Sequence, residues 1–255
     1  MVVEQFEYRE LLVQMTLRDL LLRYKQSVMG FGWAVLMPIV NTVIFTVIFA
    51  RVAKLETPVA YPVFAFCGFW VWNAFAAALA FGSTALVSNS TLVTKVYFPR
   101  EIFPFSAVFV CTVDFFVGIL PLAVLMIWYQ IPVGIHLLWL PLVFLVHTLF
   151  TVAMALLLSM ANLFFRDVKY LVNIGLQVWM FATPVVYDID TVTGKLGTVL
   201  RLNPMTPIVE GYRHVLLYNQ APPATLVTAG LVSLVAFFGG WLWFHRSEFK
   251  FAESV

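Results

Sequence analysis

Charged residues are scarce in this chain. Of its 255 residues, 11% are Lys, Arg, Asp or Glu and 62% are hydrophobic, and the mean hydropathy is +0.93. A soluble domain typically has about 25% charged residues, so a soluble fold of this size would lack the polar side chains to cover itself. The composition predicts a polytopic membrane protein. The formal net charge of +2 gives no reason to expect nucleic acid as a partner.

Cysteine is also rare, and its placement argues against a special role. Cys67 and Cys111 both fall inside apolar runs and form no CxxC pair, which favours small packing residues over a disulfide or a metal site. The four histidines are far apart in the sequence. We therefore expect no metal and no other cofactor in this chain.

Motifs for catalysis and for ATP binding are missing as well. No G-x-x-x-x-G-K-[ST] loop, H-E-x-x-H pair or nucleophile elbow occurs, so the chain is predicted not to be an enzyme. Ion-coupled carriers usually bury several ionisable groups in their spans, but here the predicted spans hold only Asp114 and His147. A lone Asp is more often bonded to a neighbouring helix than a proton carrier. Either the protein is passive, or another protein drives it.

Long apolar runs are what the chain has in abundance. A spanning helix needs about 20 apolar residues, and six such segments are predicted, at 28–50, 61–87, 102–128, 138–164, 170–186 and 225–244. We therefore expect an all-α protein with six transmembrane helices.

Lys and Arg predict the orientation of these spans. Ten of the 15 basic residues lie on the side of the termini and five on the other: the first group is Arg9, Arg18, Arg23, Lys25, Lys95, Arg100, Arg166, Lys169, Arg246 and Lys250. Both termini are thus predicted to be cytoplasmic.

Two segments are predicted to be helical without crossing the membrane. Apolar residues recur with helical spacing at Val13, Leu17, Leu20, Leu21, Tyr24 and Val28, which indicates an amphipathic helix in the cytoplasmic interface. It serves either as an anchor for the first span or as a docking surface. The external segment 188–223 contains two apolar pieces too short to cross, separated by the turn "NPMTP". We expect two short helices there, which either dip into the membrane and return as re-entrant helices or lie on the outer surface.

Several stretches together resemble a known family. They are "RDLLLRYKQSVMGFGWAVLMP" (18–38), "VSNSTLVTKVYFPREIFP" (87–104), "ANLFFRDVKYLV" (161–172), "TPVVYD" (183–188) and "LNPMTPIVEGYRHVLL" (202–217). In this order they resemble the membrane subunit of type-2 ABC exporters for cell-surface polysaccharides, the O-antigen and teichoic-acid group. Capsule exporters are a less close match because they generally lack the "YFPRE" wording.

The resemblance implies a fold and a set of partners. It implies a single permease domain over 1–255, with an interface helix (1–27), five spans (28–187), gate helices (188–223) and a sixth span with a cytoplasmic tail (224–255). It also implies a homodimer in the cell inner membrane, associated with two copies of a separate ATPase that binds ATP and Mg²⁺. The cargo would be a glycan on a polyprenyl diphosphate, as in lipopolysaccharide biosynthesis. The alternatives are a permease for a capsule glycan, drug or small lipid, and a passive channel.

The loop 88–101 is the predicted contact with the ATPase. A coupling element needs stiffness and a polar surface, and the residues assigned to this role are Lys95, Tyr97, Phe98, Pro99, Arg100, Glu101 and Pro104. Residues 88–90 are expected to cap a short helix, and Pro99 suits the first turn of the next one. The alternative is that Lys95 and Arg100 merely contact lipid phosphates; that alternative does not require Glu101 or the two prolines.

Other candidate residues form two groups. The cytoplasmic interface group is Arg18, Arg23, Tyr24, Arg166 and Asp167; Arg23 and Tyr24 either stabilise the interface helix or meet a lipid diphosphate, and Arg166 and Asp167 either contact the ATPase or form a helix-ending turn. By analogy with the family, the substrate path or outer gate group is Trp33, Trp179, Tyr187, Asn203, Pro204 and Tyr212. For the tryptophans the alternative is an interfacial aromatic belt.

Overall fold

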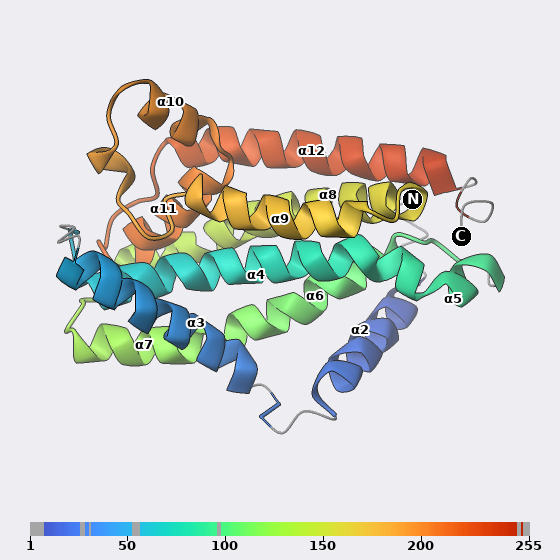
Figure 1. The fold of residues 1–255 in the computed structure, drawn as a ribbon, viewed down its shortest axis with the longest axis horizontal. Coiled ribbons are helices and arrows are strands. Elements are labelled where there is room, and N and C mark those ends of the chain that lie inside the picture. The colour runs from blue at the N-terminus through green and yellow to red at the C-terminus, as the bar shows by residue number, and fades with distance from the viewer. Residues whose placement is uncertain are drawn as a thin grey trace.

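The computed structural model describes residues 8–25, 29–30, 32–52, 57–95, 98–248 and 251. Within these ranges all regular elements are helices. The long helices lie side by side along one axis (Figure 1). α5 (Ser90–Lys95), the end of α12 (Thr225–Ser247) and the turn between α8 (Leu140–Phe164) and α9 (Val168–Phe181) gather at one end, which we call the basic end. These are segments that the charge distribution predicts to be cytoplasmic.

Four stretches of helix are long and apolar enough to cross a membrane. They are α4 (Tyr61–Ser88), the pair α6 (Ile102–Val117) and α7 (Ile119–Trp128), the 3₁₀ turn η2 (Ile135–Trp139) with α8, and α12. They confirm the predicted positions of spans two, three, four and six. The predicted first span corresponds to α3 (Gly32–Phe45) followed by the π-helical segment η1 (Thr46–Val52), and the fifth to α9. The protein is therefore a multi-pass membrane protein, and the count of six spans stays a prediction.

α9 ends earlier than predicted. The helix stops at Phe181, whereas the apolar run continues to Val186. Pro184 explains the difference, because it disfavours a helical conformation at Thr183 and has no N–H to donate. Val185 and Val186 remain buried in the core although they are not helical. The prediction from the sequence included both residues in the fifth span only because they are hydrophobic.

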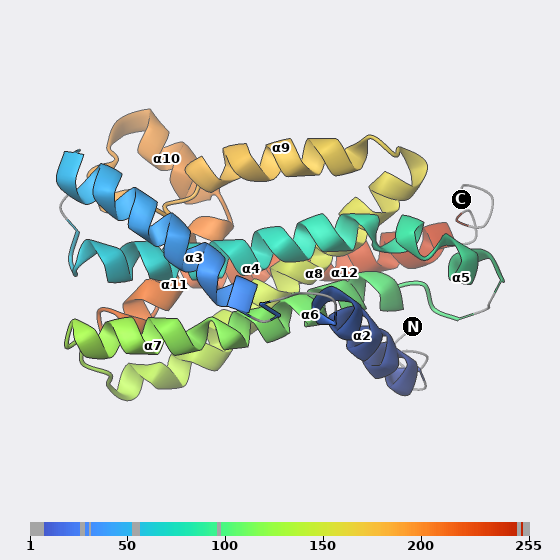
Figure 2. The ribbon, with the colours of Figure 1, turned by 60° about the horizontal axis from the view of Figure 1, so that its bottom comes forward.

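α4 is the central helix of the bundle. It packs against α3, α6, α8, α9 and α11 (Met205–Leu216), and 18 of its 28 residues are buried. Figure 2 shows α9 running alongside α4 and α3 crossing α4 obliquely, and both helices border one hollow. Small residues on α4 leave room between those two helices, and this arrangement creates the candidate site described below.

The third span is bent where α6 meets α7, at Gly118. Pro121 follows three residues later and lacks the N–H that would bond to the carbonyl of Val117. The Trp70 indole fills the bend: its Nε1 donates to the Phe115 carbonyl at 2.7 Å. A Cβ added at Gly118 would lie 2.5 Å from Cδ1 of Trp70. Glycine is therefore required here for the close approach of Trp70.

The N-terminal helix α2 (Arg9–Tyr24) packs against α6. Its contacts with the core come from Leu11, Leu12 and Met15. Of the predicted apolar stripe, Val28 lies outside the described residues and Leu20 and Tyr24 are half-buried, whereas Val13, Leu17 and Leu21 are exposed. Because these side chains face away from the protein, the helix keeps an apolar side available for lipid.

The segment 188–223 contains the two short helices that were predicted. After the 3₁₀ turn η3 (Ile189–Thr191), α10 (Gly194–Leu202) buries only Gly197 and Leu200. By contrast, 11 of the 12 residues of α11 are buried, and α11 packs against α4, α8 and α12. The burial of α11 fits backbone that dips into a bundle and returns.

Candidate functional site

Two adjoining hollows run along α4 and form what we call the α4 groove. The larger, of about 830 Å³, lies between α3, α4, α6 and α9. The second, of about 730 Å³, continues towards Ser88 and Asn89 at the basic end. Both are lined by Arg23, Ala77 and Ala80. The sequence places alanine along this side of α4, so the backbone itself forms the floor of the groove.

The lining of the larger hollow is unusual for an apolar bundle. Its walls include the amide side chains of Asn41, Asn73, Asn173 and Gln177, together with the predicted path residue Trp33. Amide groups both donate and accept hydrogen bonds, and an indole ring offers an apolar face. Such a surface can bind a chain of sugar rings through their hydroxyls and their apolar faces.

Arg23 and Tyr24 meet Asp114 inside this groove. Asp114 is twelve residues from the start of α6, or about 18 Å at 1.5 Å per residue. Arg23 Nη1 lies 2.9 Å from Asp114 Oδ2, and the Tyr24 hydroxyl donates to Oδ1. Burial and this hydrogen bond raise the pKa of Tyr24 well above its usual range. The prediction that Asp114 bonds to a neighbouring helix is confirmed.

Arg18 lies at the basic end of the groove. Its guanidinium donates to Asp19 at 2.7 Å and to Asn89 at 2.9 Å. The side chain of Asn89 also donates to the Ala85 carbonyl at 2.8 Å, so it does not cap α5 as expected. The Asn89 side chain bonds to Arg18 and Ala85 in place of the first turn of α5. Because Arg18 belongs to α2, its bond to Asn89 also attaches α2 to the end of α4.

The predicted coupling residues form a closely packed turn between α5 and α6. Phe98 is buried, with its ring centroid 5.5 Å from that of Phe103. The Pro99 carbonyl accepts from the Ile102 amide at 3.3 Å, but α6 begins at Ile102, so Pro99 lies in the turn before that helix and not in its first turn as predicted. Pro104 is buried in the first turn of α6, where its missing N–H has no cost. Tyr97 and the side chain of Lys95 lie outside the described residues.

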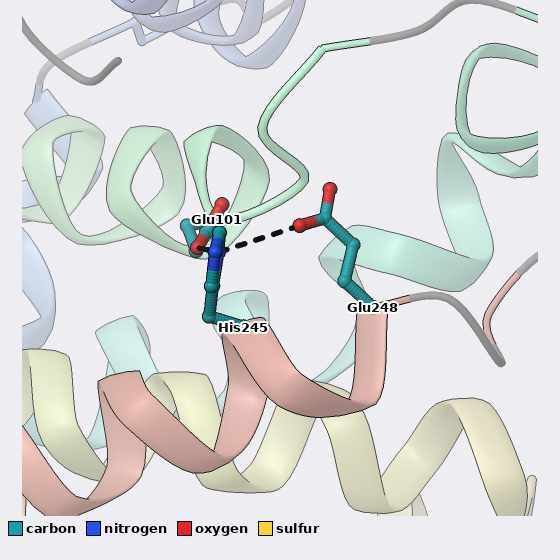
Figure 3. Close-up of side chains that lie close together, drawn as sticks. All are labelled: Glu101, His245 and Glu248. Carbon is teal, nitrogen blue, oxygen red and sulfur yellow. Dashed lines mark hydrogen bonds and ion pairs between the residues drawn. The ribbon is translucent and has the colours of Figure 1, made fainter. Parts of the chain in front are cut away.

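Glu101 contacts His245 at the end of α12 (Figure 3), and Arg100 bonds to Glu248, the residue after that helix. Arg100 Nη1 donates to the Glu248 carbonyl at 2.6 Å, and its Nε donates to the Val93 carbonyl at 3.2 Å. Glu101 is 1% exposed, and its Oε1 lies 3.1 Å from His245 Nδ1. Burial raises the pKa of Glu248, and the neighbouring Glu101 raises it further. These contacts fix the turn between α5 and α6 to α12.

Arg166 and Asp167 occupy the other turn at the basic end. Both are exposed between α8 and α9. The Asp167 carbonyl accepts from the amides of Tyr170 and Leu171, so it opens α9. The Lys169 amide donates to Asn162 at 3.0 Å. The turn ends one helix and begins the next, and its two charged side chains remain available to a partner.

The predicted gate residues at the opposite end differ in their surroundings. The Asn203 amide donates to Ala182 and Thr183, and its Oδ1 accepts from Trp179 Nε1 at 3.0 Å. Asn203 therefore joins the end of α9 to the turn before α11, which Pro204 opens. Trp179 packs against Phe75 and does not line the α4 groove.

Tyr187 and Tyr212 complete the predicted gate group. The Tyr187 hydroxyl donates to the Phe181 carbonyl at 3.0 Å, which holds the chain after α9. Tyr212 is fully buried, and its hydroxyl lies 3.3 Å from Nδ1 of His147. In this structure Tyr212 belongs to the core rather than to a surface.

Arg213 has a structural role that the sequence did not indicate. It is fully buried, pairs with Glu210 at 2.9 Å and donates to the carbonyls of Pro184 and Val185 at 2.5 and 2.7 Å. A Cβ at Gly68 would lie 2.7 Å from its Nη2 and collide with the Val185 carbonyl. Arg213 thus attaches the turn after α9 to α4 and α11.

The amide side chains of the α4 groove and the partners of Arg100 and Glu101 at the end of α12 were also not among the site residues predicted from the sequence. Four amides inside otherwise apolar spans were a usable signal, since burying an amide without a partner is costly. The pairing of Glu101 with His245 carried no such signal, because 144 positions separate them.

The chain is similar in sequence to known transport proteins. The family described as "ABC-2 type transporter" matches residues 10–217. An "O-antigen export system permease protein RfbA" from Myxococcus xanthus is 31% identical over 259 residues, covering 100% of this chain and 99% of that protein. Two proteins of the same name from Klebsiella pneumoniae are 28% and 26% identical over 250 residues, covering 96% of this chain and 95% of each relative.

Proposed function

The chain belongs to the ABC-2 type transporter family, and we propose that it is the membrane permease of an exporter for a lipid-linked surface polysaccharide of the O-antigen type. The observation that carries this proposal is the full-length similarity to relatives named O-antigen export permeases. The membrane would be the cytoplasmic, or inner, membrane. ATP hydrolysis, with Mg²⁺, would take place on a separate ATPase.

The α4 groove supports a glycan as the cargo. Its amides offer donors and acceptors to sugar hydroxyls along the wall, and Arg18 and Arg23 lie towards the basic end. Guanidinium groups bind phosphate oxygens well. We propose that the sugar chain passes the amides while the diphosphate of its polyprenyl carrier meets the arginines.

A second copy of the chain would close the groove. The outer faces of α3 and α9 carry exposed apolar side chains, among them Val40, Val43, Ile174 and Val178. Both helices border the groove, so a dimer formed through them would place two grooves beside one seam. We propose that a homodimer with two ATPase subunits encloses the path in this way.

The turn between α5 and α6 is the proposed contact with the ATPase. Phe98 and Glu101 are buried within the chain, so the residues left to touch a partner include Pro99, the outer face of α5 and the turn with Arg166 and Asp167. The Arg100 contacts with Glu248 provide a route by which force on this turn reaches α12 as well as α6.

Deletion of the gene in its native host tests the function. We expect loss of surface polysaccharide together with accumulation of the lipid-linked glycan on the cytoplasmic leaflet, measured by surface labelling and by extraction of lipid-linked sugars. A plasmid copy should restore both. Normal surface polysaccharide in the deletion strain would overturn the proposal.

Coupling is tested separately by replacing 99–101 with Gly-Ser-Gly. The variant should insert normally but lose export and substrate-linked ATP turnover, because the stiff turn and its contacts with α12 are gone. The control places the same three residues at 221–223, in the loop before α12 at the opposite end, where they also remove proline from a connection. The control should export as the parent does, and normal export from the first variant would exclude the turn as the coupling element.

A further inference from the structure

Three potential metal ligands from distant parts of the sequence meet at the basic end. A carboxylate oxygen of Glu101, Nδ1 of His245 and a carboxylate oxygen of Glu248 all lie within 4.8 Å of one another. Glu101 precedes α6, whereas His245 lies in the last turn of α12 and Glu248 directly follows that helix, and both side chains project towards Glu101 (Figure 3). We propose that Glu101, His245 and Glu248 bind a divalent transition-metal ion.

The geometry is close to that of a coordinated ion. Zinc binds imidazole nitrogen at about 2.0–2.1 Å and carboxylate oxygen at about 2.0–2.2 Å, so tetrahedral ligand atoms lie about 3.4 Å apart. His245 Nδ1 is 3.1 Å from Glu101 Oε1 and 3.6 Å from Glu248 Oε2. The two carboxylates need only a small approach to complete three ligands. One nitrogen and two carboxylate oxygens suit Zn²⁺ or Mn²⁺.

The burial of Glu101 is an independent reason to expect a cation. Its side chain is 1% exposed, and its Oε2 has no hydrogen-bond partner among the described residues. A buried carboxylate oxygen without a donor is unfavourable. The guanidinium of the neighbouring Arg100 does not supply a donor to Glu101 Oε2, because it bonds to the carbonyls of Glu248 and Val93. A divalent ion would neutralise both carboxylates at once.

The site is accessible from solution. The side chains of His245 and Glu248 are 33% and 16% exposed, and three protein ligands leave a further position for water. In the ion-free chain Nδ1 can donate its proton to Glu101. On binding, that proton passes to solvent and the nitrogen lone pair binds the ion, so affinity should fall as the pH is lowered.

No metal site was expected from the sequence, because the four histidines are far apart along the chain. The fold brings one of them, His245, next to Glu101 and Glu248. The proposed metal site does not depend on the nature of the exported cargo. Its consequence is structural: the ion would hold the turn between α5 and α6 against α12, in addition to the contacts that Arg100 makes.

Calorimetric titration of the purified, untagged full-length chain with Zn²⁺, after treatment with a chelator, tests the site. We expect one ion per chain, with at least about tenfold weaker binding in E101Q, H245Q and E248Q, since even indirect changes at metal sites cost 10–100-fold. H214Q, at the other end of the molecule, is the matched control and should bind as the parent does. Millimolar Mg²⁺ should not displace the ion.

Zinc should also raise the Tm of the parent and H214Q but not of the three ligand variants. If H245Q does not give a folded protein, E248Q decides, because Glu248 follows the last residue of α12 and Gln keeps its shape. Absence of stoichiometric Zn²⁺ binding by the parent would overturn the proposal, as would equal affinity in parent and E248Q. The cluster would then be a hydrogen-bonded contact alone.

Discussion

The guanidinium carbon of Arg213 lies 3.6 Å from the centroid of the Phe64 ring. This contact joins α11 to α4, and the same guanidinium bonds to Glu210 and to two carbonyls of the turn after α9. One fully buried side chain therefore connects three segments of the predicted outer end.

Replacing Arg213 with Met should destabilise the protein severely. Glu210 would remain as a buried charge without its partner, and breaking a buried pair in this way costs about 3–5 kcal/mol. Chemical denaturation in detergent, followed by tryptophan fluorescence, measures the change. Arg201→Met is the control, because its pair with Asp190 is exposed and should contribute less than about 1 kcal/mol. Similar stability of the two variants would contradict the assigned role of Arg213.

Gly68→Ala should also destabilise the chain. The added Cβ would collide with the Val185 carbonyl and lie 2.7 Å from Arg213 Nη2, and relieving such overpacking typically costs about 1–3 kcal/mol. Gly239→Ala is the matched control, since nothing lies within 4 Å of a Cβ there and alanine favours the helix by up to about 1 kcal/mol. Opposite shifts in Tm are expected, and a rise in both would refute the close contact.

Tyr24→Phe should loosen α2. The variant loses the hydrogen bond to Asp114, and bonds to charged groups contribute about 1.5–3 kcal/mol, so amides of α2 should exchange with deuterium roughly tenfold faster or more. Thr16→Ala serves as the control, because the Thr16 hydroxyl bonds to Leu12 within the same helix. Unchanged exchange in Tyr24→Phe would mean that other contacts hold α2 to α6.

Ala77→Trp should block export without unfolding the chain. Ala77 lines both hollows of the α4 groove, and an indole there would fill the proposed path. Ala236→Trp, in a shallow apolar hollow on α12, adds the same side chain away from the groove. Surface polysaccharide should fall in the first strain alone, with equal amounts of both proteins in the membrane. Full export with Trp at position 77 would exclude this groove as the path.

The sequence predicted the helices better than their contacts. Apolar runs placed α4 and α12 to within a few residues, since length and hydrophobicity are local properties. The end of α9 was predicted wrongly because the apolar run outlasts the helix, although Pro184 marked a boundary.

Side-chain partners were harder to predict. Arg100 and Glu101 were identified as unusual, but Glu248 and His245, which they contact, are more than 140 positions away. Local features of the sequence singled out Arg100 and Glu101, while their orientation depends on how α12 packs against the turn, which no local pattern specifies.

The bend at Gly118 has a mechanical consequence. Since the Trp70 indole supplies a hydrogen bond to the Phe115 carbonyl and Pro121 has already interrupted the backbone pattern, the third span consists of two rods that share a joint. α6 carries the turn at the basic end, and α7 leads to the opposite end. A tilt of α6 can therefore be absorbed at this joint, so that one half of the span moves while the other keeps its position.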